Sequence, residues 1–146
     1  MPRRHRVFAL FGCFLLTTAL GSGLALAAET VHVDLVDNND GSMAISTSED
    51  SVKAGKVTFQ VTNKSGDVEH EFLIAQLTVP PNDVPFDEST GVVKEGALKG
   101  VRELGDLEPG NSGAMTLDLE AGKYLLFCNM PGHYKAGMYH VLTVTE

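Results

Sequence analysis

The residues best suited to metal chemistry lie close together near the C-terminus. Cys128, His133 and Met138 supply a thiol, an imidazole and a thioether in the spacing Cys-x4-His-x4-Met. A second imidazole, His70, lies upstream. Each of these residue types alone is more often a buried or hydrogen-bonded side chain than a ligand, but the combination is far more specific. The four residues together predict a metal site.

Copper is the metal that this set of donors suits best. Two imidazoles and a thiolate in one plane, with a weak thioether on the axis, form the blue copper site. The thiolate is a soft ligand, imidazole is acceptable to both Cu(I) and Cu(II), and the thioether favours Cu(I). Zinc is the competing metal, but structural zinc sites take more cysteines and do not use methionine. The expected ligands of a single copper ion are His70, Cys128, His133 and Met138.

Short strands and tight turns must bring these residues together. Alternating apolar and polar residues with many β-branched side chains indicate strands, and clusters of Gly, Asn, Asp and Pro indicate turns. Cys128 then ends one strand and Met138 begins the next. Pro131-Gly132 and Gly137 bend the loop between them. The strands are predicted at residues 31–36, 42–47, 56–63, 69–75, 114–119, 123–127 and 138–145.

Seven to eight such strands predict an all-β fold, a Greek-key β-sandwich. In such a sandwich the strand ends that carry the candidate ligands can meet at one pole. The stretch 76–104 departs from the pattern, because two prolines lie near its start and its strand character is weak. We expect a short helix over residues 92–99 within this excursion, which either has a function or covers an edge of one sheet.

The first 27 residues have the features of a secretory signal peptide. Three arginines, ending at Arg6, precede a largely apolar run, and a small-x-small cleavage site ends at Ala27. Charge, apolar run and cleavage site in this order predict removal of residues 1–27, with cleavage after Ala28 as an alternative. Residues 28–146 would then form one mature domain, which is long enough to bury a core.

The expected location of the protein follows from this segment. An exported chain works outside the cytoplasm, in a bacterial periplasm or at the cell surface, and is not stably inserted in a membrane once it is cleaved. A retained anchor is the alternative, since residues 8–28 could just span a bilayer. Threonine, serine and glycine residues interrupt that run, which favours cleavage.

Charge and cysteine content exclude other classes. The 146 residues include 19 Asp and Glu and 11 Lys and Arg, for a net charge of −8. Three of the basic residues and none of the acidic ones lie in residues 1–27, so 8 basic and 19 acidic residues give the rest a net charge of −11. A nucleic-acid partner is not expected, because binding phosphate needs a basic face. Cys13 lies in the signal segment, so Cys128 cannot form an internal disulfide in the mature domain.

The mature sequence resembles the cupredoxins, the type 1 blue copper proteins typified by plastocyanin, azurin, rusticyanin and sulfocyanin. The resemblance runs from the first strand to Thr145 and is strongest from Gly105 onward. There Gly-x-x-x-Pro-Gly, Gly122-Lys123-Tyr124 and Cys-x4-His-x4-Met follow one another in the family's order. The interval from cysteine to histidine is most similar to that of the rusticyanin and sulfocyanin type, since plastocyanin has a shorter one.

The resemblance implies a cupredoxin domain over residues 28–146 that binds one type 1 copper ion. It implies that His70, Cys128 and His133 are the equatorial ligands and that Met138 is the axial ligand. Single-copper members of the family shuttle electrons and are not enzymes. Multicopper oxidases and copper nitrite reductases place a histidine beside the cysteine, whereas the neighbours of Cys128 are phenylalanine and asparagine.

A few positions depart from the family or need their own interpretation. Glu71 replaces the asparagine that plastocyanin and azurin place after the upstream histidine, although its backbone N–H could still reach the Cys128 sulfur, as the family's geometry implies. His140 replaces a common glycine and is expected to be partly buried and bonded to the backbone, and not a ligand. His32 should face solvent. The apolar rim expected around an exposed edge of His133 consists of Met130, Pro131, Tyr134 and Ala136.

Two functions remain open for a single exported copper site. The first is a one-electron carrier between redox partners, and the alternative is a periplasmic copper-binding protein for copper tolerance or delivery. Copper-handling proteins often carry exposed His- or Met-rich tails, and the mature sequence has no such cluster outside the ligand loop. The electron carrier is therefore the preferred interpretation.

An acidic run suggests how a redox protein could dock. Between residues 83 and 108 there are seven acidic residues and only three basic ones. Charge sets the rate at which proteins with small, weak interfaces meet. This face could bind a basic cytochrome c or a terminal oxidase, or it could simply be solvated. The protein itself is expected to be a monomer. The acids are Asp83, Asp87, Glu88, Glu95, Glu103, Asp106 and Glu108.

Overall fold

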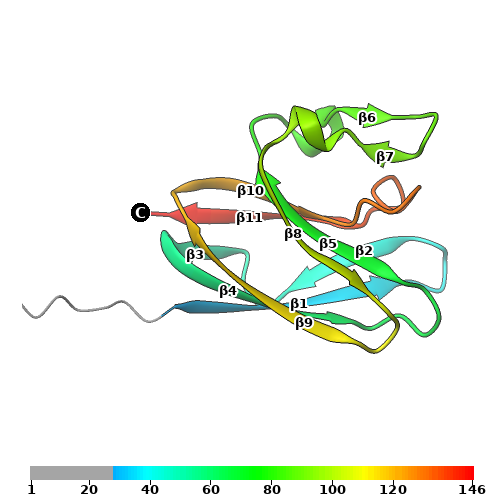
Figure 1. Ribbon diagram of the computed structural model, residues 1–146, viewed down its shortest axis with the longest axis horizontal. Coiled ribbons are helices and arrows are strands. Elements are labelled where there is room, and N and C mark those ends of the chain that lie inside the picture. Colours follow the sequence, from blue (N-terminus) through cyan, green and yellow to red (C-terminus); the bar gives the residue numbers. More distant parts are fainter. Residues whose placement is uncertain (1–27) are drawn as a thin grey trace, which may run out of the picture.

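In the computed structural model, which describes residues 28–146, two sheets pack face to face (Figure 1). The strand order of the first sheet is β2 (Met43–Thr47), β1 (Glu29–Asp37), β4 (Gly55–Asn63) and β9 (Ser112–Leu119). The strand order of the second is β3 (Ser51–Lys53), β11 (Tyr139–Thr145), β10 (Gly122–Phe127), β5 (His70–Gln76) and β8 (Lys99–Leu107). The predicted all-β sandwich is confirmed. The predicted signal peptide lies outside the described residues.

Both sheets combine parallel and antiparallel pairs. β1 pairs in parallel with β4, and β11 pairs in parallel with β3. The other neighbouring strands of the two sheets are antiparallel. All seven strands predicted from the sequence occur, and none of their ends differs from the prediction by more than two residues.

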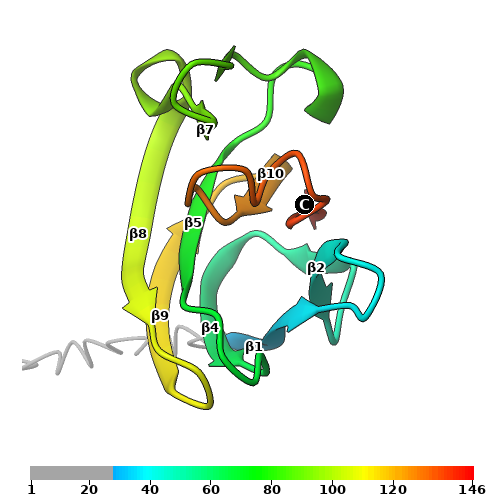
Figure 2. The ribbon, with the colours of Figure 1, turned by 90° about the vertical axis from the view of Figure 1, so that its right-hand side faces the viewer.

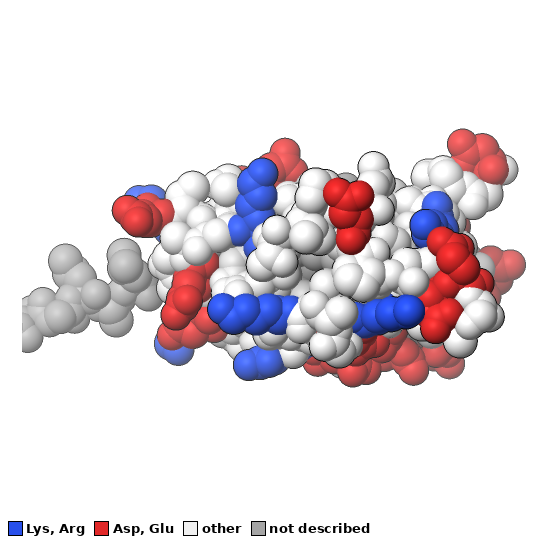
Figure 3. All heavy atoms as spheres, turned by 90° about the horizontal axis from the view of Figure 1, so that it is seen from above, with Lys and Arg blue, Asp and Glu red and all other residues white. Residues whose placement is uncertain are grey.

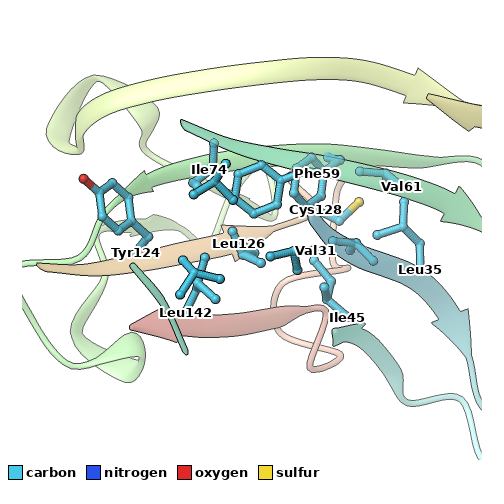
Figure 4. Packing of buried hydrophobic residues seen from close by; sticks show 14 of the residues in the cluster. Val31, Leu35, Ile45, Phe59, Val61, Ile74, Tyr124, Leu126, Cys128 and Leu142 are labelled. Carbon is cyan, nitrogen blue, oxygen red and sulfur yellow. The ribbon is translucent and has the colours of Figure 1, made fainter. Parts of the chain in front are cut away.

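Alternating side chains of the facing strands fill the space between the sheets. In β4, Phe59 and Val61 are fully buried, and the ring of Phe59 lies 5.9 Å from that of Phe72 in β5. Burial of an apolar side chain of this size stabilises the fold by about 1.5–3 kcal/mol. Cys128 belongs to the same cluster and points toward the end at which Val61 and Leu35 lie (Figure 4).

The excursion between β5 and β8 covers the outer face of the second sheet and not an edge. Val84 and Val93 of the excursion pack with Leu73, Leu125 and Phe127 of the sheet in a second buried cluster. Figure 2 shows the excursion above the loop that joins β10 and β11. Its short elements are η1 (Pro81–Asp83), β6 (Phe86–Asp87), β7 (Val92–Val93) and η2 (Glu95–Ala97).

The helix expected over residues 92–99 is reduced to η2, a single 3-10 turn. The preceding residues are extended instead, because the side chain of Asn129 accepts a hydrogen bond from the Val93 N–H and donates one to the Val93 C=O. Among the described residues, no helix is long and apolar enough to cross a membrane.

β8 is the long strand that the sequence analysis missed. It pairs with β5 at the edge of the second sheet, and most of its residues are exposed or half-buried. Gly100 and Gly105 interrupt its alternation, with φ values of +68° and +96°. Charged residues such as Arg102 and Glu103 hide its strand character, although charge on an edge strand is common because it discourages pairing with other chains.

Candidate metal centre

Three of the four candidate ligands meet at one pole of the sandwich. His70 is the first residue of β5, Cys128 directly follows β10, and His133 lies in the loop between β10 and β11. Nδ1 of His133 lies 3.2 Å from Nδ1 of His70 and 3.3 Å from Sγ of Cys128. The ligand atoms of all three residues lie within 4.8 Å of one another.

Met138, the fourth candidate, lies in the core beneath the same loop. Its side chain is fully buried and belongs with Cys128 to the main hydrophobic cluster. Its C=O accepts a hydrogen bond from the Cys128 N–H at 3.1 Å, and its N–H donates to the His133 C=O at 3.0 Å. The backbone of Met138 therefore links the other two residues of the motif. Met130, the other methionine of the loop, is half-buried and packs against the same cluster.

The ligand loop, residues 128–138, is a series of tight turns. The N–H of His133 donates to the Met130 C=O at 3.1 Å, and the N–H of Gly137 donates to the Tyr134 C=O at 3.1 Å. Gly137 has a φ of +103°, and a Cβ atom there would lie 2.9 Å from the Met43 carbonyl oxygen. Only glycine has no Cβ and adopts this backbone freely, so the turn before Met138 requires it.

Neighbouring elements hold the ligand loop from both sides. At the start of β2, the N–H of Met43 donates to the Ala136 C=O at 2.9 Å. On the other side, the N–H of Gly132 donates to the C=O of Gly91 in the excursion at 2.8 Å. The loop is therefore fixed by both the first sheet and the excursion.

Two side chains of the loop strengthen its attachment to the excursion. Besides its two bonds with Val93, Asn129 donates to the Glu95 carboxylate at 2.7 Å. The hydroxyl of Tyr134 donates to the Pro81 C=O at 2.8 Å. The sequence analysis missed this role of Asn129, whose partners lie more than thirty positions away.

Burial sets the protonation of the three clustered residues. It raises the pKa of the Cys128 thiol to about 11, although the backbone N–H groups of Met130 and Glu71 act in the opposite direction. Burial is also the main cause that lowers the pKa of His70 and of His133. At neutral pH, two neutral imidazoles therefore offer lone pairs, and a metal ion must displace the thiol proton to bind.

The donor set fits a copper ion. A soft sulfur and two imidazole nitrogens converge on one point, a combination that suits copper in either oxidation state. The N–H of Glu71 donates to Cys128 Sγ at 3.3 Å, as the family resemblance implied. Such a bond favours the thiolate over the thiol. His70 is fully buried, whereas His133 is partly exposed, so one edge of the site reaches the surface.

An acidic surface adjoins the site. Because β5 pairs with β8, Glu71 lies opposite Asp106 and next to Glu103. Burial and these neighbouring carboxylates raise the pKa of Glu71 to about 7. Figure 3 shows acidic side chains gathered at the right-hand end and along the lower edge of one face, with basic side chains mainly across its middle. The sequence analysis found the acids of β8 but did not include Glu69 and Glu71 in the acidic surface. These two residues lie beside the acids of β8 only because β5 pairs with β8.

Three smaller expectations have mixed outcomes. His32 is exposed, as predicted. His140 is partly buried, but its Nε2 lies 3.1 Å from Oγ1 of Thr47 and 3.2 Å from Oδ1 of Asp50, so its partners are side chains and not the backbone. Tyr134 is buried in the second cluster and is not part of a surface rim, because the excursion covers it.

Comparisons with known proteins agree with this geometry. The family profile described as copper binding proteins, plastocyanin/azurin family, matches residues 31–145. A search of curated proteins finds no match. Auracyanin from Roseiflexus castenholzii aligns with a TM-score of 0.58 and 20% identity, over 82% of this chain and 99% of that protein. Rusticyanin from Thiobacillus ferrooxidans aligns with a TM-score of 0.53 and 22% identity, over 82% of this chain and 79% of that protein.

A larger protein shares the fold as well. A multicopper oxidase from Aquifex aeolicus aligns with a TM-score of 0.53 and 18% identity, over 82% of this chain but only 30% of the oxidase. At such identities these alignments establish the fold alone. The fold therefore occurs both in small single-domain proteins and as part of a large oxidase.

Proposed function

The chain belongs to the plastocyanin/azurin family of copper-binding proteins, so its cofactor is one type 1 copper ion, and we propose that it carries single electrons between redox partners outside the cytoplasm. The observation that carries this proposal is the convergence of two imidazoles and a thiol within 4.8 Å at a pole where one of the imidazoles reaches the surface. The proposed ligands are His70, Cys128, His133 and Met138.

The chain contributes a fixed and mostly dry set of donors. Bound copper supplies a one-electron couple. His70 and Cys128 are fully buried, which keeps water from their donor atoms. The contacts of the ligand loop with β2 and with the excursion hold the donors in one arrangement, so little needs to move when the charge of the site changes. His133 provides the short route to the surface.

The acidic surface is the proposed docking face for a basic partner. Glu71, Glu103 and Asp106 lie beside the site on β5 and β8. Complementary charge speeds encounter between proteins that meet over small interfaces. A basic cytochrome c or a terminal oxidase with a basic surface fits this description, and a nucleic acid does not. The protein is proposed to act as a monomer.

An enzymatic role has less support. Within residues 28–146, His70, Cys128 and His133 form the one cluster of three or more metal-ligating side chains. An oxidase that reduces oxygen with several electrons needs further copper ions near the first. The alternative of copper delivery or tolerance shares the same site, and kinetics separate it from electron transfer.

The first experiment tests the site. The Cu(II) protein should be blue or green, with an intense visible band from thiolate-to-copper charge transfer. Cys128→Ser should abolish that band while Cu(II) still binds through the remaining donors. Copper that loads into the wild-type protein without such a band would show that the ligand assignment is wrong.

The second experiment separates the carrier from the copper handler. Stopped-flow reduction by a basic cytochrome c should be fast and should slow steeply with salt, because added ions screen charge beyond about 10 Å at 0.1 M. Glu103→Gln with Asp106→Asn should slow it at low salt, and the matched pair Glu120→Gln with Glu146→Gln should not. Slow, salt-independent reduction together with ready Cu(I) transfer to a competing protein would support copper handling instead.

The proposed location rests on the features of residues 1–27. The mass of the exported protein should correspond to a chain that begins at Ala28 or Glu29. A protein that keeps residues 1–27 and sediments with membranes would favour the retained anchor.

A further inference from the structure

A carboxylate from the opposite sheet faces the far side of His70. While Nδ1 of His70 points to the other donors, its Nε2 lies 3.0 Å from Oδ1 of Asp37, the last residue of β1. Both atoms are buried, and among the described residues neither has a hydrogen-bond partner of good geometry, so this charged contact is the one polar contact that each of them makes. Each of these polar atoms therefore has only the other to compensate for its burial.

The carboxylate is itself held in place by a network. The hydroxyl of Ser65 donates to Oδ2 of Asp37 and accepts a bond from the N–H of Val68 at 2.9 Å. The N–H of Ser65 donates to the Asn63 side chain at 2.8 Å, and that side chain donates to the Leu107 C=O at 2.7 Å. Asn63 and Ser65 are buried. The position of Asp37 is thus fixed by the turn between β4 and β5.

We propose that Asp37 is a positioning residue for the metal site, an inference that rests on the proposed copper function. Asp37 holds the proton of His70 on Nε2, which leaves the lone pair on Nδ1, the atom that faces Cys128 and His133. A carboxylate behind a ligating histidine fixes its ring and makes it a stronger donor. Because negative charge favours the more positive metal ion, Asp37 stabilises Cu(II) relative to Cu(I) and lowers the reduction potential of the site.

Asp37→Asn tests the inference, because asparagine keeps the shape and an acceptor oxygen but removes the charge. We expect the ratio of Cu(II) to Cu(I) affinity to fall about tenfold, which is a rise of about 59 mV in a one-electron potential. Asp34→Asn removes the same charge from the same strand, three positions earlier, and should leave the potential close to that of the wild type. Ser65→Ala removes the hydroxyl that holds the carboxylate but keeps the carboxylate itself. It should raise the potential, but by less than Asp37→Asn does.

The outcomes separate this inference from the proposed function. A blue wild-type protein whose potential is unchanged by Asp37→Asn would overturn the role of Asp37 and leave the copper site intact. Absence of the blue band from the wild type would overturn the copper site itself. A second measurement, on the wild type, tests the proposal even if the Asp37 variant does not fold. In the wild-type Cu(I) protein, ring-nitrogen NMR of His70 should show a proton on Nε2 that exchanges slowly with water, and a fast-exchanging or absent proton would contradict the proposal.

Discussion

The two imidazoles of the site are held in contrasting ways. His70 begins a strand, is fully buried, and has Asp37 of the opposite sheet against its outer nitrogen. His133 lies in a loop and is partly exposed, and the hydrogen-bond contacts of its ring are to Cys128 and His70. One side of the site is built from the packed sandwich, and the other is built from a loop at its surface.

The contrast shows how one site can be both rigid and accessible. The His70 side takes its geometry from strand pairing and core packing. The His133 side would be mobile if only the loop held it, but β2 and the excursion bond to the loop backbone on either side. His133 can therefore reach the surface while the other proposed ligands stay fixed in place.

Removal of each imidazole gives the largest expected effect. His70→Gly and His133→Gly should both lose the intense visible band, because each removes a proposed ligand. Added imidazole should restore the band in His133→Gly, whose cavity opens to solvent. It should not do so in His70→Gly, whose cavity is closed by the core and by Asp37. Visible spectra during an imidazole titration check this, and equal recovery in both variants would contradict the contrast.

Gly137→Ala tests how firmly β2 constrains the loop. The positive φ at this position disfavours alanine, and the new Cβ would lie 2.9 Å from the Met43 carbonyl oxygen. Strained backbone of this kind costs about 1–3 kcal/mol, so we expect a loss in the free energy of unfolding near the top of that range. Gly110 has a φ of +78°, and a Cβ atom there would meet nothing within 4 Å, so Gly110→Ala should lose distinctly less. Denaturant unfolding of both metal-free variants measures the difference, and equal losses would show that the contact with Met43 is unimportant.

Substituting Met138 and Met130 in turn identifies which of the two methionines is the axial ligand. Met138→Leu should keep the blue colour and raise the reduction potential by about 59 mV or more, because loss of a donor disfavours Cu(II) more than Cu(I). Met130→Leu should leave the potential unchanged, since this half-buried side chain only packs against the core. Voltammetry and electron spin resonance check both variants. If Met130→Leu perturbs the resonance spectrum and Met138→Leu does not, the wrong thioether has been assigned.

The smallest expected effect concerns pH and the acidic surface. Glu71 has a pKa raised to about 7 by burial and by its carboxylate neighbours. Its folded state therefore binds a proton more tightly than the unfolded state, and stability falls as pH rises from the unfolded pKa of about 4.3 to about 7. Glu71→Gln should reduce this fall by less than about 1 kcal/mol, because solvent screens part of the repulsion. Thermal unfolding of the metal-free protein at pH 4 and pH 8 checks the sign, and an unchanged slope would contradict it.

The local parts of the site could be read from the sequence because they depend on spacing. Cys128, His133 and Met138 lie in one loop between two strands, so their order alone brings them together. The strands around them alternate clearly, and the position of His70 at a strand start follows from the same alternation. These features need no knowledge of distant contacts.

The missed features depend on contacts between distant segments. Asp37 reaches His70 from the other sheet, and nothing in the sequence near Asp37 signals that contact. Asn129 fixes Val93 in an extended conformation, which overrides the helix expected there. β8 was hidden because an edge strand with glycines and charges does not alternate like a buried one. Tyr134 was expected at the surface, because nothing in the sequence near it signals that the excursion packs over its ring.

The distance along the chain between the donors links copper to the order of folding. His70 and His133 lie 63 positions apart, and both parallel strand pairs join segments that are not consecutive. Folds rich in such distant pairings form slowly, in milliseconds to seconds. All four donors lie on the second sheet or on the loop that joins two of its strands, so the complete set exists only after β5 has paired with β10. A ligand that binds the native state alone then stabilises it by mass action. The appearance of the blue band during refolding with Cu(II) present would then report when β5 and β10 have paired.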